Sequence, residues 1–177
     1  MITAAVDGSS LSNPGPAGWA WVVDDACWAC GGWPVATNNR GELMALLALL
    51  RATAAAGRAD ETLRVLADSQ YVINSVTKWL PGWKRRGWRR GDGKPVLNAD
   101  LMQALAEALT GRDVRFEWVK GHDGHPLNEA ADQRARSAAT AYQQGREPSA
   151  GPGFSGKTGG ESPVAATAPP AEQPGLF

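Results

Sequence analysis

Short apolar runs separated by turn residues open the chain and predict β-strands. The run "ITAAVDG" lies at the N-terminus and is followed by "NPGPAG", which has the composition of a turn. The runs "WAWVVDD" and "CWACGGW" come next and are rich in tryptophan and small apolar residues. Runs of this length between turn residues are typical of neighbouring strands. We therefore expect three strands that pair as a meander.

Helical spacing of apolar residues begins near residue 38. In "NNRGELMALLALLRATAAAG" the leucines recur every three or four positions, which predicts one buried helical face. Asn38 or Asn39 would cap this helix, and Gly57 would end it. Strands and helices then alternate. The strand "TLRVLAD" precedes the helix "SQYVINSVTKW", the helix "NADLMQALAEALTG" precedes the strand "DVRFEWVKG", and a last helix begins at Pro126. This order predicts a mixed α/β sheet with helices packed on it.

The C-terminal segment has a different composition. Residues 146–177 hold half of the chain's 12 prolines, many glycines and few residues able to form a core. Such a composition predicts disorder. We expect one folded domain over residues 1–145 and a disordered tail over residues 146–177.

The overall composition favours a soluble cytoplasmic protein. Lys and Arg together number 18, as do Asp and Glu, so any binding of nucleic acid needs a local basic cluster. The N-terminus lacks the basic and apolar regions of a secretory signal, and no uncharged apolar run reaches the ~18 residues of a membrane span. Cys27 and Cys30 lie three residues apart on a predicted strand, where they would face opposite sides, so we expect them to be structural.

Four carboxylates occupy unusual positions in this pattern. Asp7 and Asp68 each follow the apolar run of a strand, Glu42 lies in the first turn of an apolar helix, and Asp132 lies near the start of the last helix. Each alone has an ordinary interpretation, as a turn residue or as a helix-start charge favoured by the helix dipole. Together, on neighbouring strand ends, they predict a cluster of oxygen ligands for a hard divalent ion such as Mg²⁺.

Both histidines of the chain lie in "GHDGHPLNEAAD", three residues apart. From the residues alone, His122 and His125 could be metal ligands, a catalytic pair, or parts of a His-containing loop.

Six blocks of the sequence resemble bacterial ribonuclease HI. They are "VDGSSLSNPGPAGW", "TNNRGEL", "LADSQYVI", "WLPGWKRRGW", "KPVLNADL" and "WVKGHDGHPLNEAAD", in the order and spacing of that family, and they cover nearly all of residues 1–143. The resemblance implies a ribonuclease H-like fold, in which a five-stranded mixed sheet is flanked by helices on both faces. It also implies a monomer that cuts the RNA strand of RNA–DNA hybrids, leaves 5′-phosphate and 3′-hydroxyl ends, and removes R-loops and RNA primers.

The resemblance also assigns roles to the acidic and histidine residues. Asp7 would bridge two Mg²⁺ ions, for which Mn²⁺ can substitute, Asp132 would hold the ion that activates water, and Glu42 and Asp68 would hold the ion at the leaving group. His122 matches a mobile-loop histidine that assists proton handling and product release, and His125 a residue that positions the turn into the last helix. Three residues depart from the family: Gly41, Asp123 and Leu127. We expect Gly41 to loosen the helix start and Asp123 to raise the pKa of His122.

Hybrid binding is implied for a second set of residues. Asn13, Asn38, Asn39 and Gln70 match positions that reach the minor groove, although helix capping is the alternative for Asn38 and Asn39. Thr37 and Asn98 match a pocket for a phosphate of the DNA strand.

The stretch Lys78–Lys94 resembles a basic protrusion that holds the DNA strand. It carries seven Lys or Arg residues and one acid, interleaved with tryptophans, in a chain of zero net charge. Cations neutralise phosphates and indoles stack on sugars, so we favour a nucleic-acid surface over a merely solvated face. The residues expected to contact the strand are Trp79, Trp83, Lys84, Arg85, Arg86 and Trp88.

The last residues, "QPGLF", suggest a partner for the tail. Gln173, Leu176 and Phe177 match the Gln-x-x-Leu-Phe pattern of peptides that bind the bacterial sliding clamp, while Pro174 and Gly175 depart from it. The alternative is a chance match at a frayed terminus. For the whole chain, the alternatives to a nuclease specific for hybrids are a hybrid-binding module that does not cut, and a resolvase or transposase core that cuts DNA.

Overall fold

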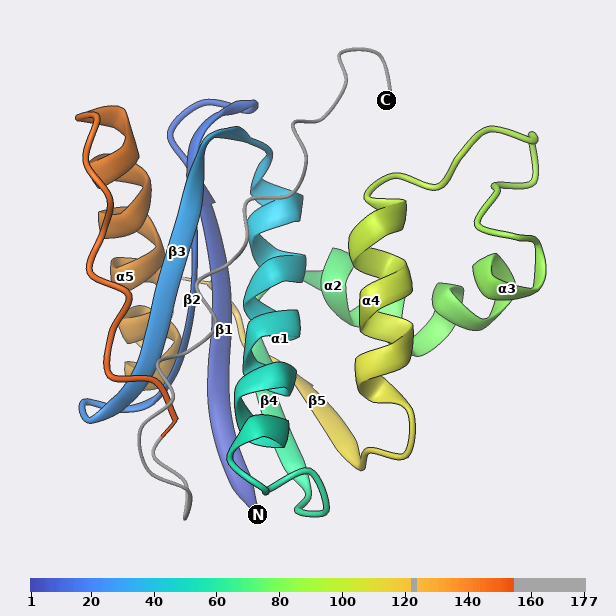
Figure 1. Cartoon of the computed structure of the whole chain (residues 1–177), viewed down its shortest axis with the longest axis horizontal. Coiled ribbons are helices and arrows are strands. Elements are labelled where there is room, and N and C mark those ends of the chain that lie inside the picture. The colour runs from blue at the N-terminus through green and yellow to red at the C-terminus, as the bar shows by residue number, and fades with distance from the viewer. Residues whose placement is uncertain (122–123, 155–177) are drawn as a thin grey trace.

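A five-stranded sheet forms the centre of the protein (Figure 1). The computed structural model describes residues 1–121 and 124–154. The strand order is β3-β2-β1-β4-β5. β2 runs antiparallel to both β1 and β3, whereas β4 runs parallel to both β1 and β5. The sheet is therefore mixed, which confirms the predicted α/β class.

The first three strands form the predicted meander. They are β1 (Ile2–Ser10), β2 (Gly15–Asp24) and β3 (Cys27–Ala36). β4 (Leu63–Ala67) and β5 (Val114–Trp118) complete the sheet beyond β1. β1 is longer than its apolar run indicates, because the polar residues at its end still pair with β2.

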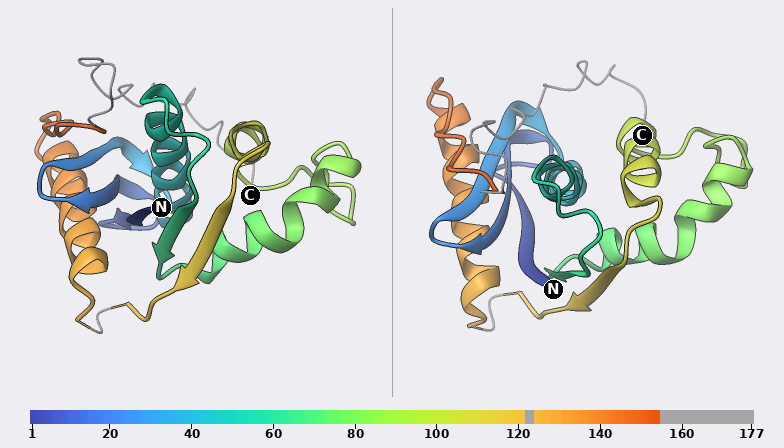
Figure 2. Two further views of the ribbon diagram at one scale, coloured as in Figure 1. Left: turned by 90° about the horizontal axis from the view of Figure 1, so that it is seen from below. Right: turned by 60° about the horizontal axis from the view of Figure 1, so that its bottom comes forward.

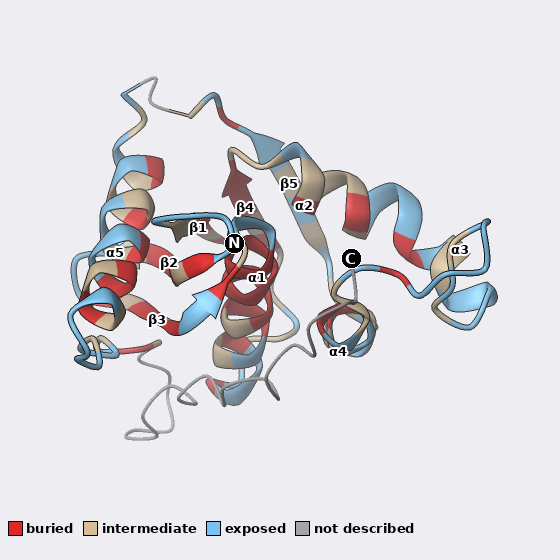
Figure 3. Ribbon diagram, turned by 90° about the horizontal axis from the view of Figure 1, so that it is seen from above, coloured by how far each residue is buried: buried red, intermediate tan, exposed pale blue. Residues whose placement is uncertain are grey.

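Helices cover both faces of the sheet, as predicted. α1 (Asn38–Ala55) packs on one face and α5 (Pro126–Gln143) packs on the other (Figure 2). α4 (Ala99–Leu109) packs against α1 rather than on the strands. Buried residues line α1 and the strands beneath it (Figure 3). No helix in the described part of the chain combines the length and apolar character needed to cross a membrane.

Thr37, and not Asn38 or Asn39, caps α1. The Thr37 hydroxyl accepts a hydrogen bond from the backbone N–H of Arg40 at 3.2 Å, and Thr37 has an extended backbone, as an N-cap residue requires. The prediction that one of the two asparagines caps the helix is therefore wrong. Both are the first residues of the helix itself, and their side chains are exposed. The predicted end is close, since α1 stops at Ala55, two residues before Gly57.

The helix predicted over residues 69–79 is the first portion of a longer helical segment that has three parts. α2 (Gln70–Asn74) continues into a π-helical turn, η1 (Ser75–Trp79), and then into α3 (Leu80–Arg85). Pro81 lies in the first turn of α3, where a missing N–H costs little. Helical structure therefore extends farther than the apolar pattern predicts, and α3 with the loop after it projects from the body of the protein (Figure 1).

Cys27 and Cys30 face opposite sides of β3, as predicted. Cys27 packs in the main core, whereas Cys30 packs beneath α5 beside Ala135 and Ala138. Both are buried.

Residues 149–154, which we call the terminal strap, lie along the outer edge of β3. The Cys30 N–H donates to the Ala150 carbonyl at 3.1 Å, and the Gly153 N–H donates to the Trp28 carbonyl at 2.9 Å. The Phe154 ring lies 6.2 Å from the ring of Trp21. The prediction that disorder begins at residue 146 is therefore wrong for residues 146–154. Residues 155–177 lie outside the described part of the chain.

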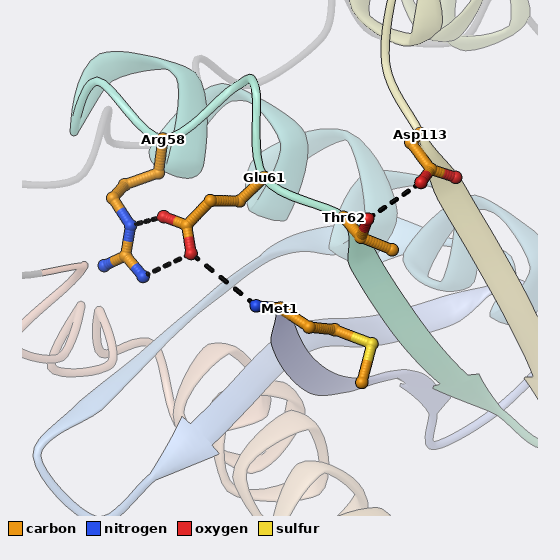
Figure 4. A network of polar contacts seen from close by, with 5 residues as sticks. All are labelled: Met1, Arg58, Glu61, Thr62 and Asp113. Atoms are coloured by element: carbon orange, nitrogen blue, oxygen red, sulfur yellow. Dashed lines mark hydrogen bonds and ion pairs between the residues drawn. The ribbon is translucent and has the colours of Figure 1, made fainter.

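A polar network joins the N-terminus to the loop between α1 and β4 (Figure 4). The Arg58 guanidinium lies 5.4 Å from the centre of the Phe154 ring and donates to both carboxylate oxygens of Glu61. The N-terminal amine of Met1 lies 3.8 Å from Glu61 Oε1. The strap thus ends against the loop that connects α1 to β4.

Candidate active site

Three of the four predicted carboxylates converge at the middle of the sheet. Asp7 lies within β1, Asp68 directly follows β4, and Glu42 lies in the first turn of α1. β1 and β4 run parallel with Val6 opposite Ala67, so the residues that follow these two lie side by side. One carboxylate oxygen from each of the three residues lies within 4.8 Å of the others. The predicted closeness of Asp7 and Asp68 is confirmed.

Two glycines let α1 approach β1 closely enough to bring Glu42 to this point. A Cβ atom on Gly8 would lie 2.4 Å from the Glu42 nitrogen and 2.6 Å from the Gly41 carbonyl carbon. A Cβ atom on Gly41 would lie 2.7 Å from the Gly18 oxygen. α1 runs without interruption through Gly41, so this glycine serves close packing of the helix start rather than the expected loosening.

We expect Gly8→Ala to disturb the carboxylate cluster. The added methyl group has only backbone atoms to displace, so the start of α1 must move away from β1. The free energy of unfolding should fall by about 1–3 kcal/mol, and activity should fall about a hundredfold because Glu42 is displaced.

Chemical denaturation and a cleavage assay would check the Gly8 prediction. Gly91→Ala is the matched control for stability, because a Cβ there meets nothing within 4 Å. Wild-type stability and activity in Gly8→Ala would contradict the role given to the close approach.

Burial makes the cluster a strong site for positive charge. Asp7 and Glu42 are only 2% and 3% exposed. Burial, together with the charges of Asp68 and Asp132, raises the pKa of Asp7 from 3.8 to about 7. Burial is also the main cause that raises the pKa of Glu42 well above its ordinary value, and the charge of Asp7 adds to it. A cation that binds here removes this repulsion.

The donor atoms of the cluster fit a hard divalent ion. All the atoms that face one another are carboxylate oxygens, the ligands that Mg²⁺ and similar ions prefer. Glu42 Oε2 is buried with no hydrogen-bond partner among the described residues. A buried carboxylate oxygen without a partner is costly, so its position favours coordination of an ion.

Asp132 lies near this group but does not join it. Its Oδ2 atom accepts a hydrogen bond from Arg136 at 2.8 Å, one turn farther along α5. Its charge nevertheless raises the pKa of Asp7, which places it close to the cluster. Among the described His, Cys, Asp and Glu residues, the group of three or more whose ligand atoms all lie within 4.8 Å of one another consists of Asp7, Glu42 and Asp68.

The histidine loop begins beside Asp68. A Cβ on Gly121 would lie 3.1 Å from Asp68 Oδ2. His122 and Asp123 themselves lie outside the described residues, so the role predicted for His122 stays a prediction. His125 directly precedes α5, and its carbonyl accepts the Glu129 N–H at 2.9 Å, consistent with its expected place in the turn.

The predicted minor-groove residues form an exposed group beside the cluster. Asn13, Asn38, Asn39 and Gln70 are all exposed. The Asn13 side-chain oxygen accepts the backbone N–H of Asn38 at 3.0 Å, which ties the β1–β2 loop to the start of α1. Gln70 is the first residue of α2, two positions after Asp68.

The two predicted phosphate-binding residues lie at the starts of two packed helices. Thr37 caps α1, and Asn98 directly precedes α4. Arg40 contacts both of them, and the sequence-based predictions did not include it. The only feature of the sequence that could have indicated a role for Arg40 is its position between Thr37 and Glu42, two predicted site residues.

The basic stretch forms α3 and the loop that projects beyond it. Lys84, Arg85 and Arg86 are exposed there. Trp79 is 42% exposed and lies with its ring 5.7 Å from that of Trp83. Trp83 and Trp88 are partly buried and pack against the core. Two of the three tryptophans thus anchor the protrusion, and Trp79 is the most accessible of them.

Known proteins share this fold and sequence. Residues 1–140 match the ribonuclease H family. A ribonuclease H of Tropheryma whipplei is 52% identical over 153 residues, which cover 86% of this chain and 93% of that protein. Ribonuclease HI of Streptomyces coelicolor is 49% identical over 147 residues, covering 79% of this chain and 62% of that protein. The crystal structure of LC9-RNase H1, a type 1 RNase H with the type 2 active-site motif, superposes with a TM-score of 0.64 at 25% identity, covering 96% of this chain and 98% of its own.

The chain therefore belongs to the ribonuclease H family, in its bacterial type 1 branch. Its activity is the endonucleolytic hydrolysis of the RNA strand of RNA–DNA hybrids. The predicted family, fold and reaction are confirmed.

Proposed function

We propose that Asp7, Glu42, Asp68 and Asp132 hold two Mg²⁺ ions, with Mn²⁺ as a substitute. The observation that carries this proposal is the group of three carboxylates, in which the two buried members, Asp7 and Glu42, have raised pKa values and one Glu42 oxygen has no hydrogen-bond partner among the described residues. Asp7, on the strand that contacts both α1 and β4, would supply ligand oxygens to both ions. Asp132 would exchange its ion pair with Arg136 for a metal ligand. When bound, the two ions would stabilise the attacking and departing oxygens of the phosphate.

Protein groups around the ions would place the RNA strand and handle protons. His122 would hold and release a proton close to Asp68, next to which Gly121 lies. Glu42, adjacent to the exposed amides of Asn38 and Asn39, would also sense a 2′-hydroxyl. Asn13 and Gln70 would contact base edges and sugars in the minor groove, since amides both donate and accept. Recognition of the 2′-hydroxyl would then be coupled to the site of cleavage.

The DNA strand would cross the opposite part of the same surface. Thr37 and Asn98 would bind one of its phosphates, and the exposed cations Lys84, Arg85 and Arg86 would neutralise others. Trp79, the most exposed of the three tryptophans, would stack on the strand, while Trp83 and Trp88 would support it.

Cleavage of an end-labelled RNA–DNA hybrid tests this function directly. We expect cutting of the RNA strand with Mg²⁺ or Mn²⁺, leaving 5′-phosphate and 3′-hydroxyl ends, and no cutting in a chelator. Duplex DNA and duplex RNA should stay intact. Tight binding of the hybrid with no cleavage under either ion would overturn the proposal and leave a hybrid-binding module, whereas cutting of duplex DNA would indicate a resolvase-like activity.

We further propose that the enzyme acts as a cytoplasmic monomer that removes R-loops and RNA primers. Its tail would bind the sliding clamp through Gln173, Leu176 and Phe177, which lie outside the described residues. Binding of purified clamp to the full chain, and its loss in Phe177→Ala, would support the interaction. Equal binding by both proteins would overturn it.

A further inference from the structure

Arg40 is a buried cation in the first turn of α1, two residues before Glu42. Its side chain is 3% exposed and lies with its guanidinium carbon 5.7 Å from the centre of the Trp33 ring. Its two terminal nitrogens donate to the Asp100 carboxylate at 3.1 and 2.6 Å. Removing a guanidinium from water is costly, and an apolar side chain would join α1 to α4 at lower cost. The position of Arg40 therefore suggests a role beyond packing.

The same arginine connects the two residues proposed to bind a DNA phosphate. Its backbone N–H donates to the Thr37 hydroxyl at 3.2 Å, and its Nη1 atom donates to Asn98 Oδ1 at 3.3 Å. Thr37 and Asn98 begin different helices and are far apart in sequence. Arg40 thus fixes the position of one relative to the other.

Arg40 also determines which end of the Asn98 amide is free to bind a ligand. A guanidinium has only donors, so the amide atom that faces it must be the oxygen. The Asn98 Nδ2 atom then faces away from Arg40. One of its two hydrogens is donated to the Tyr71 hydroxyl at 3.5 Å, and the other is available to a ligand. Phosphate oxygens only accept hydrogen bonds, so this orientation presents the group that a phosphate needs.

The backbone of Asn98 is held in one conformation as well. Asn98 has φ 55° and ψ 36°, in the left-handed region that asparagine tolerates better than most residues. Its carbonyl accepts the Met102 N–H at 2.9 Å, in the first turn of α4. With the backbone fixed, the rotation of the side-chain amide is the remaining freedom, and the bond from Arg40 removes it.

The ion pair has an electrostatic consequence at the same place. The side chain of Asp100 is 50% exposed, and it lies two residues from Asn98. The pKa of Asp100 is lowered, with burial opposing the hydrogen bonds and charge of Arg40 that favour the ionised form. An uncompensated carboxylate here would repel a phosphate, and Arg40 neutralises it.

We propose that Arg40 is a positioning residue whose guanidinium orients the Asn98 amide beside the Thr37 hydroxyl, which the backbone N–H of Arg40 already holds, to bind a phosphate of the DNA strand. This inference rests on the proposed function, in which Thr37 and Asn98 form that pocket. Arg40 acts through these two residues and does not itself contact the substrate.

Arg40→Lys is the sharpest test, because lysine keeps the charge but cannot bind Asp100 at two points and Asn98 at a third. We expect KM for the hybrid to rise about tenfold while kcat stays within about twofold. Arg112→Lys is the matched control. Arg112 is half-buried rather than fully buried, and its guanidinium likewise donates to α1, near the other end of that helix, to the Leu50 carbonyl at 3.1 Å and the Thr53 hydroxyl at 2.8 Å. That variant should leave KM unchanged.

A second readout separates positioning from a general loss of structure. A series of hybrids would each carry one neutral methylphosphonate on the DNA strand. With the wild-type enzyme, a methylphosphonate at one position should raise KM about tenfold. With Arg40→Lys, the methylphosphonate at that position should not raise KM any further. If Arg40→Lys does not fold, Arg40→Gln combined with Asp100→Asn removes both charges together, and the same result is expected.

Two outcomes would overturn the proposal in distinguishable ways. Unchanged KM and an intact methylphosphonate effect in Arg40→Lys would show that Arg40 only stabilises the fold. If no DNA phosphate proves sensitive in the wild-type enzyme while the RNA strand is still cut, the phosphate pocket itself is absent, and its positioning with it. Cleavage activity would survive both outcomes, so neither would be confused with failure of the nuclease function.

Discussion

Replacing Asp7 with asparagine is expected to abolish cleavage of the RNA strand and at the same time to stabilise the folded protein. Asp7 belongs to the carboxylate group and lies on β1, the strand that contacts both α1, which carries Glu42, and β4, which Asp68 follows. An amide supplies one neutral oxygen in place of a charged carboxylate, so it binds a divalent ion weakly. Activity should fall by about a thousandfold or more in Mg²⁺. A single-turnover assay with the end-labelled hybrid measures this loss.

The gain in stability follows from the raised pKa of Asp7. Burial raises this pKa from 3.8 to about 7, so the folded protein binds a proton that the unfolded chain releases. The ionised carboxylate therefore destabilises the metal-free protein progressively as the pH rises from 3.8 to about 7, and fully above that. Asparagine carries no charge, so the variant should exceed wild type by about 2 kcal/mol near pH 8 and match it near pH 4.

Urea denaturation in a chelator at both pH values would check the stability prediction. A variant that is no more stable than wild type near pH 8 would contradict it. Adding Mg²⁺ should narrow the difference, because the ion stabilises the wild-type carboxylates and not the variant.

Removing the cations of the protrusion is expected to weaken hybrid binding without changing the chemical step. Lys84, Arg85 and Arg86 are exposed at the end of α3. If each neutralises one phosphate, replacing all three with glutamine should raise KM by about 10–100-fold at moderate salt and leave kcat nearly unchanged. The slope of log KM against log salt should fall by about 2–3 for the same reason.

An equal change of charge elsewhere is the control for the protrusion. Arg51, Arg115 and Arg146 are also exposed and lie outside α3 and its loop. Replacing these three with glutamine alters the net charge identically and should leave the salt slope unchanged. Equal effects of the two triple variants would mean that net charge, and not the protrusion, attracts the hybrid.

The sequence predicted those parts of the site that depend on local pattern. Asp7 and Asp68 could be placed together because each follows the apolar run of its strand, and parallel neighbouring strands bring such positions to one point. The sequence groups Asp132 with these carboxylates, whereas in the structure it pairs with Arg136, because that pairing depends on side-chain rotamers that no spacing determines. The close approach of Gly8 to Glu42 could not be predicted from the sequence either. Gly8 lies on β1 and Glu42 on α1, and the distance between these elements depends on how the core packs.

Features that depend on distant partners were missed. Composition alone predicted disorder from residue 146, yet the terminal strap is ordered because β3 offers an open edge and Trp21 offers a surface for Phe154. Arg40 gave no signal, because a charged residue at the start of a helix is normally exposed, and its burial depends on Asp100 in another helix. Asn38 and Asn39 were predicted as caps from residue type, which does not determine the first residue of a helix. The helix begins at Asn38, so the capping position falls on Thr37.

The terminal strap has a consequence for how the enzyme can be attached to other molecules. Phe154 rests on Arg58, just beyond the last turn of α1, whereas Glu42 lies in the first turn of the same helix. The thirteen residues between Glu42 and the end of α1 at Ala55 correspond to ~20 Å. A tether that continues from Phe154 therefore starts from the end of the domain away from the carboxylates. A cargo or fusion partner added there would restrict where the nuclease travels without obstructing the hybrid at its catalytic surface.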